Sequence, residues 1–303
     1  MNGLLILDKP EGMTSFQAVR KVRGLTGEKK AGHCGTLDPM ATGVLPILLG
    51  GATRFLEFLP DSGKCYEAEL QLGVRTDTLD RTGKVLREQA VSCGREDLEG
   101  VLSQFCGSIL QVPPMYSARK QDGVRLYDLA RKGIEVEREA REVQIESLRL
   151  LSGDEERGRY RIAVSCSKGT YIRTLIDDIG TALGCGAMMT ELRRTATCGF
   201  SLDDAVPLSR LSALAEEGQA EKALLLLDSA LQQYPAVTIY GGQPARFSNG
   251  GALFLDRIPA FRESRPEDGA LYRVYDTSRC FLGLGKVGAA SASLEVRRLY
   301  VRR

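Results

Sequence analysis

Apolar residues near the start of the chain follow two patterns, and each predicts a different kind of strand. Residues 4–7 and 44–49 form continuous apolar runs, which are typical of strands buried on both faces. Between Tyr66 and Leu72, apolar residues alternate with Glu67, Glu69 and Gln71. This alternation predicts a strand with one face on the core, and Tyr66 begins it on the core side.

Other segments have the apolar spacing of amphipathic helices. One helix passes through Phe16, Val19 and Val22 and is capped by Thr14 or Ser15. Residues 95–106, 207–217 and 220–231 are further helical segments, and residues 172–183 form another that follows a capping Thr170. Strands are expected at 143–150 and 160–166. The chain changes character near residue 232, after which strands are short and glycines frequent.

Composition limits the class of protein. With 303 residues, 43% of them apolar and 26% charged, the chain suits one large globular domain and a small one. No stretch approaches the roughly 18 uncharged apolar residues of a membrane span. The first residues lack a basic segment leading into a long apolar run, so no export signal is expected.

The eight cysteines argue against a metal site. None belongs to a C-x-x-C pair, and His33 is the only histidine, so no zinc-ligand cluster is expected. Cys106 and Cys166 have apolar neighbours and are interpreted as reduced core residues. Free thiols of this kind indicate a cytoplasmic protein.

Positive charge is concentrated at the end of the chain. The formal net charge is +2, yet residues 273–303 hold seven Lys/Arg and two Asp/Glu, which is 7 − 2 = +5. A basic segment on a balanced body fits docking of nucleic acid. A solvated charged tail explains the same count equally well.

Candidate chemistry is concentrated in residues 31–55. His33 lies there, and Asp38 stands directly before Pro39, which biases it toward extended or turn geometry. Glycines on either side permit tight turns, so the segment is expected to present one carboxylate from a loop anchored by the buried run 44–49. Taken alone, Leu-Asp-Pro is more often an ordinary turn.

The longer pattern resembles a known family. Residues 32–46, G-H-C-G-T-L-D-P-M-A-T-G-V-L-P, resemble the catalytic motif of the TruB-type tRNA pseudouridine synthases. Residues 9–15 (K-P-E-G-M-T-S), 64–68 (K-C-Y-E-A), 75–80 (R-T-D-T-L-D) and 167–173 (S-K-G-T-Y-I-R) resemble further family motifs in family order. The resemblance implies that Asp38 is the catalytic residue.

The resemblance also implies roles around Asp38. The supporting residues would be Lys9 beneath the loop, Tyr66 stacked on the uracil, Asp80 in the ionic network, Tyr171 lining the pocket, Leu192 as its apolar wall, and Arg173 as the partner of the aspartate. The RNA-binding residues would be His33, Arg119, Lys120, Arg125, Arg193 and Arg194, of which the last two have a structural alternative.

Arg173 has an independent argument. It falls in the first turn of its predicted helix, where a cation opposes the helix dipole by roughly 0.3–1 kcal/mol. That position indicates a specific anionic partner. Asp177, four residues later, is one candidate, although this orientation is the weaker one. We expect Asp38 instead, and we expect Arg173 to lower the pKa of Asp38 and hold it charged.

By this resemblance we expect an α+β fold. Residues 1–232 would form a catalytic domain with a mixed, mainly antiparallel sheet, flanking helices and a thumb-like RNA-binding insertion at 115–141. Residues 233–303 would form a small β-rich module that resembles a PUA domain, through residues 247–253 and 281–287. The protein is expected to be a monomer.

The implied reaction converts the T-loop uridine at tRNA position 55 to pseudouridine. The N1–C1′ bond is cleaved, the flipped base turns, and C5 joins C1′, so nothing is oxidised or added and no cofactor is needed. The partner is the T-arm stem-loop of tRNA, and a role in tRNA folding could accompany catalysis. The carboxylate would act as nucleophile or would remove the 2′ proton, and the sequence leaves both open.

Two other functions fit parts of the same sequence. A non-catalytic RNA-binding protein would use the basic thumb and tail without chemistry, but Asp38, Tyr66 and Arg173 argue against binding alone. A hydrolytic glycosidase usually needs two positioned acids, whereas the expected companion of Asp38 is an arginine.

Overall fold

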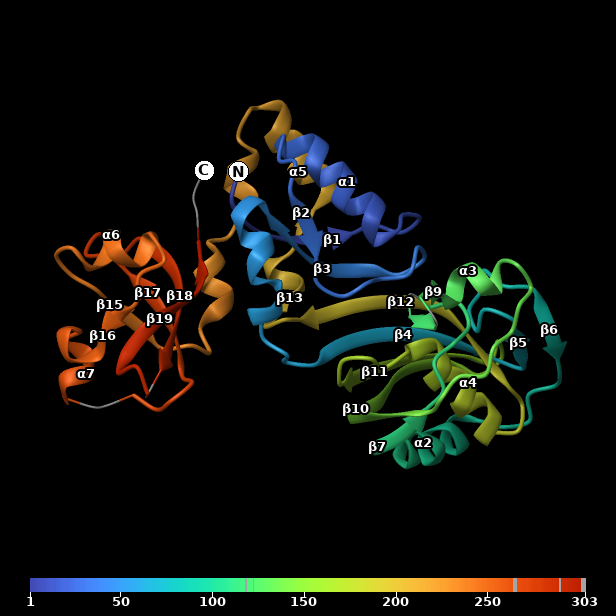
Figure 1. Cartoon of the computed structure of the whole chain (residues 1–303). Helices are drawn as coiled ribbons and strands as arrows, with labels where there is room; N and C mark the ends of the chain where they lie inside the picture. The colour runs from blue at the N-terminus through green and yellow to red at the C-terminus, as the bar shows by residue number, and fades with distance from the viewer. Residues whose placement is uncertain (118, 122, 264–265, 289, 301–303) are drawn as a thin grey trace.

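The computed structural model describes residues 1–117, 119–121, 123–263, 266–288 and 290–300, and for Lys120, Gln121, Arg125 and Glu263 the backbone alone. Its main feature is a ten-stranded, mainly antiparallel sheet, as predicted (Figure 1). The strand order along it is β14 (Val206–Pro207), β1 (Gly3–Lys9), β3 (Thr42–Leu49), β12 (Ala187–Thr197), β4 (Lys64–Leu72), β11 (Arg159–Cys166), β10 (Arg141–Asp154) and β7 (Gly107–Gln111). The short strands β2 (Ala31–His33) and β13 (Phe200–Ser201) pair with β3 and β12.

Only two of these pairings are parallel, β1 with β14 and β3 with β12. The second joins the strand that follows the Asp38 loop to the strand that carries Leu192, with Arg193 opposite Thr42. Four strands central to the predicted motifs therefore lie side by side in the order β1, β3, β12, β4.

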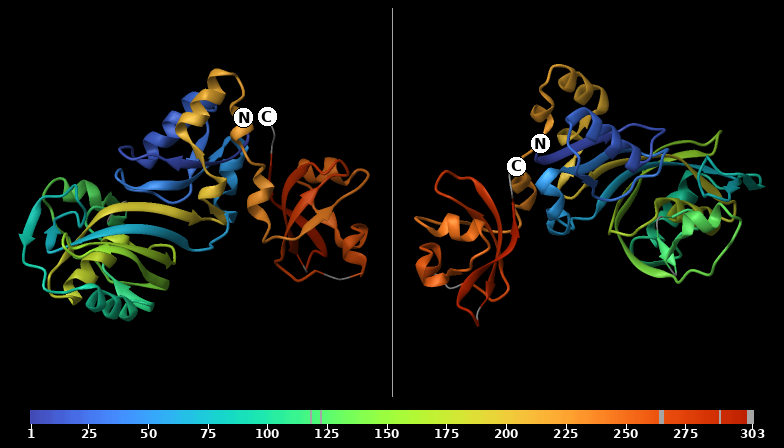
Figure 2. Two further views of the ribbon diagram at one scale, coloured as in Figure 1. Left: turned by 180° about the vertical axis from the view of Figure 1, so that it is seen from behind. Right: turned by 45° about the horizontal axis from the view of Figure 1, so that its top comes forward.

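Helices cover one face of the sheet. Helix α2 (Arg95–Gln104) packs on β10 near the β7 end, and α4 (Ile172–Ala182) packs mainly on β12, while α1 (Ser15–Thr26) and α5 (Leu208–Glu216) lie near β1 (Figures 1 and 2). Apolar side chains from all four helices and from both ends of the sheet form one continuous core. The remaining elements of this part are η1 (Gly50–Phe58), β5 (Val74–Thr76), β6 (Val85–Glu88), β8 (Lys120–Gln121), β9 (Val124–Arg125), α3 (Leu126–Ala130), η2 (Leu202–Asp204), η3 (Ala220–Ala223) and η4 (Leu227–Leu231).

The C-terminal part folds around its own sheet. Its strand order is β15 (Ala236–Thr238), β17 (Leu271–Tyr275), β18 (Phe281–Gly288), β19 (Ser293–Leu299) and β16 (Leu253–Phe254). The short helices α6 (Gln243–Ser248), η5 (Leu255–Arg257) and α7 (Ala260–Glu263) complete it. This β-rich arrangement was expected from the frequent glycines and short apolar runs after residue 232.

A second apolar core joins the two parts. The outer faces of β1 and β3 pack with η1, η4 and β18, so the C-terminal sheet lies against the first strands of the main sheet. The ring of Phe55 lies 5.9 Å from that of Phe281 and 5.9 Å from that of Tyr300. Arg298 donates to Glu57 at 2.6 Å across the same junction. Part of the basic tail therefore joins the two domains.

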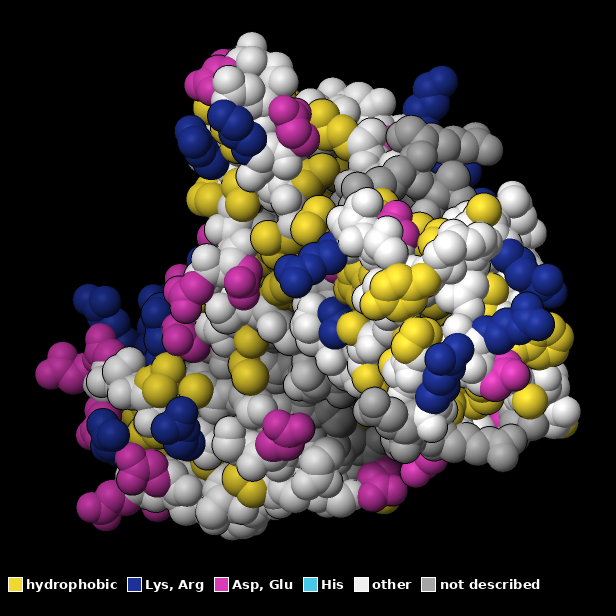
Figure 3. All heavy atoms as spheres, turned by 90° about the vertical axis from the view of Figure 1, so that its left-hand side faces the viewer, with side chains coloured by type: hydrophobic (Ala, Val, Ile, Leu, Met, Phe, Trp, Pro, Cys, Tyr) yellow, Lys and Arg dark blue, Asp and Glu magenta, His cyan; other side chains and the backbone are white. Residues whose placement is uncertain are grey.

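The space-filling view from the C-terminal side shows how charge is distributed there (Figure 3). Lys and Arg side chains are interspersed with Asp and Glu and with apolar side chains. The Lys and Arg side chains visible on that face do not form an uninterrupted basic patch.

Three local expectations are wrong. Phe16 points away from the core and is 69% exposed, because the buried positions of α1 are Ala18, Val19 and Val22. Cys106 is exposed, whereas Cys166 is buried as predicted. Residues 220–231 form the two short 3-10 helices η3 and η4 rather than one α-helix, since Leu225 leaves the helix to exchange backbone hydrogen bonds with Leu4.

Within the described residues, none of the helices is long and apolar enough to span a membrane. The same part of the chain contains no cluster of three or more His, Cys, Asp or Glu side chains that could hold a metal ion.

Candidate active site

The loop between β2 and β3 presents Asp38, and hydrogen bonds hold it on both sides. Before Asp38, the Ser15 hydroxyl at the start of α1 donates to the carbonyl of Leu37 at 3.1 Å and accepts from its backbone N–H at 2.8 Å. After Asp38, the carbonyl of Pro39 accepts from the backbone N–H of Gly12 at 2.9 Å. The 9–15 segment and the Asp38 loop therefore form one unit.

Lys9 ties the base of this unit together. Its side chain is fully buried, and Nζ donates to the carbonyls of Pro10 at 2.8 Å, Met13 at 2.7 Å and Pro39 at 3.4 Å. Burial lowers the pKa of Lys9 to about 8, while the charge of Asp38 opposes that shift. This geometry fits the predicted supporting role beneath the catalytic loop.

Arg173 meets Asp38 as predicted. Its Nε lies 3.0 Å from Oδ2 of Asp38, and Nη2 donates to Oδ1 at 3.3 Å, which gives a two-pronged ion pair. The remaining donors are also used, because Nη1 donates to the carbonyl of Thr78 at 3.1 Å and Nη2 to that of Tyr116 at 2.9 Å. A rigid fork from the first turn of α4 therefore fixes the orientation of the carboxylate.

The alternative partner is occupied elsewhere. Asp177 accepts two hydrogen bonds from Arg75, at 2.7 and 2.8 Å. Instead of the weak i, i+4 pair within α4, the structure has two ion pairs between distant parts of the chain. Arg173 pairs with Asp38, and Arg75 pairs with Asp177.

The charge on Asp38 is set by opposing effects. Burial raises the pKa of Asp38 above its ordinary value, even though its side chain remains 33% exposed. Arg173 lowers that pKa, Asp80 raises it and Lys9 lowers it. The expected influence of Arg173 is present, but burial outweighs it, so the pKa shifts in the direction opposite to our expectation.

Asp80 lies on the far side of Arg173, with Oδ2 3.8 Å from Nη1. It is buried, and its Oδ1 accepts hydrogen bonds from the Thr78 hydroxyl at 2.8 Å and from the N–H and hydroxyl of Thr82 at 2.9 and 2.6 Å. These bonds fold the turn so that the Thr78 carbonyl reaches Arg173. Asp80 therefore belongs to the ionic network, as the resemblance implied.

The start of α4 differs from its sequence-based prediction. Tyr171, rather than Thr170, occupies the cap position, and the Thr170 hydroxyl donates to the Ser167 carbonyl at 3.0 Å. Gln111, on β7, holds Tyr171 instead: its side-chain oxygen accepts from the Tyr171 N–H at 2.7 Å and its side-chain nitrogen donates to the carbonyl at 3.1 Å. No sequence pattern indicated Gln111, since its role depends on the end of β7 lying beside the start of α4.

Tyr66 and Leu192 lie on the neighbouring strands β4 and β12, and both are buried. Burial raises the pKa of Tyr66 to about 12, and the charge of Asp38 also acts on this pKa. The phenol therefore stays neutral near the carboxylate. His33 is half-buried at the end of β2; burial and Arg194 lower its pKa, and its buried Nδ1 has no hydrogen-bond partner among the described residues.

Arg193 and Arg194 point to opposite faces of β12. Arg193 is partly exposed and forms a two-pronged pair with Asp8 at 2.8 and 3.2 Å. Arg194 is fully buried and donates to the carbonyls of Val44 at 2.8 Å and Gly35 at 3.1 Å. In this structure Arg194 is a structural residue of the loop rather than an RNA-facing one.

Gly43 makes this contact between β3 and β12 possible. Its φ is +100°, and a Cβ at this position would lie 2.2 Å from the carbonyl oxygen of Arg194. Only glycine fits this close backbone approach.

The predicted thumb, residues 115–141, carries the short helix α3 (Figure 1). Its first residues contribute the Tyr116 carbonyl to Arg173, and the Tyr116 ring packs edge-on against Tyr127 at 6.3 Å. Arg119 is half-buried. The side chains of Lys120 and Arg125 lie outside the described part of the structure.

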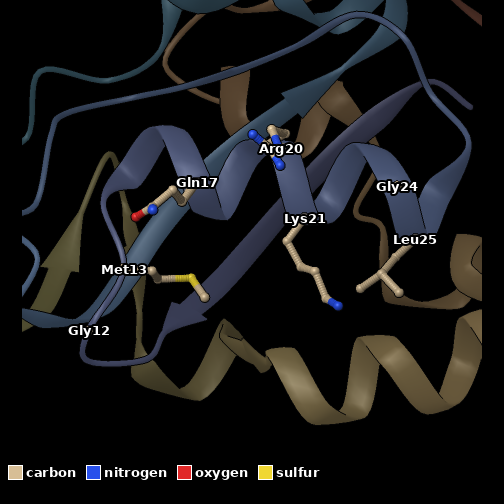
Figure 4. A pocket seen from close by; sticks show the side chains of 7 residues that line it. All are labelled: Gly12, Met13, Gln17, Arg20, Lys21, Gly24 and Leu25. Atoms are coloured by element: carbon tan, nitrogen blue, oxygen red, sulfur yellow. The ribbon is translucent and has the colours of Figure 1, made fainter.

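A groove of about 540 Å³ runs along α1 (Figure 4). One side of the groove is formed by the side chains of Met13, Lys21 and Leu25. The residues that line the groove include no Asp or Glu. A second cavity of about 180 Å³ lies beside Met40 and Leu192. Neither is lined by Asp38, so the candidate centre remains the ion pair itself.

Three family models together match most of the chain. The N-terminal domain of TruB family pseudouridylate synthase matches residues 23–172. The C-terminal domain of tRNA pseudouridylate synthase B matches residues 173–234, and the C-terminal model of pseudouridine synthase II TruB matches residues 235–300.

Curated relatives and solved structures are similar along almost the whole chain. The chain is 47% identical to tRNA pseudouridine synthase B of Stutzerimonas stutzeri, over 95% of this chain and 92% of the relative. It is 42% identical to the protein of that name from Clostridium acetobutylicum, over 95% and 96%. A chain of an H/ACA RNP bound to a substrate RNA containing 2′-deoxyuridine superimposes with a TM-score of 0.71 and 25% identity, over 99% of this chain and 86% of that chain. A chain of a Cbf5–Nop10–Gar1 complex gives a TM-score of 0.71 and 27% identity, over 99% and 85%.

Proposed function

The chain belongs to the TruB family of pseudouridylate synthases and isomerises uridine to pseudouridine in tRNA, and we propose that Asp38 is the residue on which this reaction depends. The observation that carries the proposal is the two-pronged pair between Asp38 and Arg173, at 3.0 and 3.3 Å. It holds one carboxylate, still partly open to solvent, at a loop fixed from both sides.

The substrate proposed is the T-loop uridine at position 55, presented by the T-arm stem-loop. The match of residues 32–46 and of four further segments to the family motifs supports this choice. A stacked uridine must first be turned outward, which costs a few kcal/mol. Tyr66 stacks on the flipped uracil, Leu192 and Tyr171 line its pocket, and His33 lies on the RNA side of the loop.

Asp38 acts at the sugar in its ionised form. As a nucleophile it attacks C1′ while the N1–C1′ bond breaks; as a base it removes the 2′ proton. Both routes need a carboxylate oriented toward one side of the ribose, and the ion pair with Arg173 fixes that orientation. The uracil stays in the pocket, turns, and forms the C5–C1′ bond with loss of the C5 proton.

A hydrolytic glycosidase is the weaker candidate. Asp80 is the carboxylate whose charge raises the pKa of Asp38. It is buried, and its Oδ1 accepts three hydrogen bonds. It is therefore poorly placed to serve as the second acid that hydrolysis usually needs. Release of free uracil would support the glycosidase, whereas retention of the base in the RNA excludes it.

The free thiols of all eight cysteines support a cytoplasmic location, and we propose that the protein acts there as a monomer. Sedimentation of the purified chain checks the second point, and a dimeric mass would contradict it.

The test is tritium release from T-arm RNA that carries [5-³H]uridine, measured for the wild type and for Asp38→Asn. The amide keeps the shape of the side chain but supplies neither a nucleophile nor a base, so we expect at least a roughly 10³-fold fall in the rate. RNA affinity should stay within about twofold. Arg75→Gln, which breaks the separate pair with Asp177, is the matched control and should release tritium normally.

Activity retained in Asp38→Asn would overturn the assignment of Asp38. If neither protein released tritium while both bound the RNA tightly, the chain would bind this RNA without isomerising its T-loop uridine.

A further inference from the structure

Two cysteines from distant parts of the chain meet beside the catalytic loop. Cys34 follows His33 at the end of β2, and Cys198 lies in the turn between β12 and β13. Their Sγ atoms are 3.1 Å apart, although the two residues are 164 positions apart in the chain. Both are free thiols, and the proposed reaction uses neither of them.

The backbone fixes both thiols. The N–H of Cys34 donates to the Pro46 carbonyl at 2.9 Å. Cys198 has a left-handed φ of +54°, and the next residue, Gly199, donates to the Ser62 hydroxyl at 2.9 Å. The short contact is therefore a property of two anchored segments. A disulfide needs an S–S distance of about 2.05 Å, so the two sulfur atoms must move about 1 Å closer before the bond can form.

The surroundings favour one thiolate in this pair. The hydrogen bond between the thiols lowers the pKa of Cys198 to about 6, and Thr197, Arg194 and Lys64 act in the same direction. The pKa of Cys34 is raised, mainly by the same hydrogen bond, so Cys34 keeps its proton. A thiolate beside a thiol is the arrangement that reacts with oxidants and then closes to a disulfide.

We propose that Cys34 and Cys198 form an oxidation site that takes hydrogen peroxide as its co-reactant and closes to an intramolecular disulfide. Peroxide suits the site because Cys198 is only 6% exposed, which excludes bulkier oxidants.

The reaction has two steps. The Cys198 thiolate attacks one peroxide oxygen, the O–O bond breaks, and Cys198 becomes a sulfenic acid while hydroxide leaves; the proton that the Cys198 thiol gave to solvent on ionising converts this hydroxide to water. The Cys34 sulfur then attacks the Cys198 sulfur, the S–O bond breaks, and the departing hydroxide takes the Cys34 proton. Overall, two thiols are oxidised to one disulfide and one peroxide is reduced to two waters.

The disulfide would act on the catalytic loop. Cys34 is four residues before Asp38, and between them the Gly35 carbonyl accepts from Arg194. Closure pulls the chain toward β13 and removes the thiolate that faces Lys64 and Arg194. Since misplacement by about 1 Å can cost up to roughly 10²-fold in rate, we expect at least a tenfold lower kcat. This consequence, unlike the oxidation itself, rests on the proposed function.

A second pair of thiols provides an internal control. Cys93 and Cys185 lie with Sγ atoms 3.5 Å apart, near the ends of α2 and α4 and away from Asp38. Burial raises the pKa of Cys93 to about 11, so the Cys93 thiol stays protonated and reacts slowly with peroxide.

The experiment treats the full chain with hydrogen peroxide, alkylates the remaining thiols and maps disulfide-linked peptides by mass spectrometry. We expect a 34–198 link, a matching loss of tritium release, and recovery of both by a thiol reductant. Cys198→Ser should form no link and should keep its activity under peroxide, whereas Cys93→Ser should behave as the wild type.

Failure to form the 34–198 link would overturn the site, and a link without loss of activity would overturn its effect on the loop. If peroxide inactivated Cys198→Ser as fast as it inactivates the wild type, the loss of activity would come from another residue, and the proposed effect of the disulfide would be wrong. Because the mass measurement does not depend on catalysis, an enzyme that released no tritium before treatment would refute the proposed function without affecting the test of the oxidation site.

Discussion

At Asp38, the two environments that a carboxylate can have in a protein are combined. Burial makes ionisation harder, and the guanidinium of Arg173 makes it easier. Because burial is the larger effect, the pKa of Asp38 lies above its ordinary value, and Arg173 limits that rise. The ion pair thus both orients the carboxylate and supports its ionisation.

This balance predicts a pH effect in Arg173→Lys. The ammonium keeps the charge but loses the fork and two of its backbone contacts, so Asp38 is stabilised less and its pKa rises further. Since the reaction needs the deprotonated form, the acid limb of log(kcat/KM) against pH should move to higher pH. The measurement is the pH profile of tritium release.

Arg75→Gln serves as the matched control, because it also removes a two-pronged arginine pair but one that faces Asp177. Its acid limb should coincide with that of the wild type. An unchanged acid limb in Arg173→Lys would contradict the assigned coupling.

At the scale of the element, the position of α4 decides where Arg173 points. The helix begins at Ile172, and its first turn is held by the amide of Gln111 on β7. No hydroxyl cap is present, so the helix start depends on the neighbouring strand.

Gln111→Leu should therefore affect both stability and rate. It leaves the N–H of Tyr171 without its partner and removes one of the two hydrogen bonds to the Tyr171 carbonyl, which still accepts from Leu175; this costs about 1–3 kcal/mol in the free energy of unfolding. Arg173, two residues later, should lose its alignment, so kcat should fall more than KM rises. Urea unfolding and steady-state kinetics measure the two effects.

Thr170→Ala separates this structure from the sequence-based prediction. A capping threonine is worth about 1 kcal/mol, so a true cap would cost at least that much when removed. If Thr170→Ala proved more damaging than Gln111→Leu, the cap predicted from the sequence would be right.

The thumb gives a prediction for RNA binding. If Arg119 contacts a phosphate, Arg119→Gln should weaken binding of all T-arm sequences alike and reduce the slope of log K against log salt by about 0.7–0.9. Arg149, an exposed arginine on β10, offers the control Arg149→Gln. Equal slopes in both variants would remove Arg119 from the RNA interface.

At the scale of the whole molecule, the two domains share an apolar core instead of a free linker. Phe281 of the C-terminal sheet is buried against Phe55, in the same core as residues of β1 and of β3, the strand that follows the Asp38 loop. The orientation of the C-terminal domain is thereby coupled to the sheet that carries the active site.

Phe281→Ala should destabilise the protein by about 3–5 kcal/mol, because it opens a cavity in this shared core. Thermal unfolding should show the loss, and the KM for tRNA should rise if the C-terminal domain holds the RNA. Tyr240→Ala, at an exposed position of the same domain, should change stability by less than about 0.5 kcal/mol. A similarly small effect of Phe281→Ala would mean that the domains do not depend on this junction.

Much of the fold followed from local pattern. The continuous runs 4–7 and 44–49 became the buried strands β1 and β3, and the alternation from Tyr66 gave β4 with its predicted face inward. Phe16 was wrongly predicted to face the core. It lies at the edge of the apolar stripe of its helix, and the sequence does not show whether another element packs over that edge. The predicted burial of Cys106 was wrong for the same reason.

Within the candidate site, the sequence identified side chains and the fold identified their neighbours. Asp38, Arg173, Tyr66 and Lys9 were visible because each lies in a recognisable string of residues. Gln111, the Thr78 carbonyl and the Tyr116 carbonyl were not, since a backbone oxygen has no identity in sequence and a glutamine on an edge strand has many possible uses.

The sequence by itself determined the strands, the loop that presents Asp38 and the family to which the chain belongs, because these depend on contiguous residues and their spacing. Tertiary structure alone decided that burial outweighs Arg173 in setting the pKa of Asp38, that Arg194 is enclosed, and that Cys34 meets Cys198. Desolvation and through-space contact depend on what packs around a group, and that packing is supplied by segments far away in the chain.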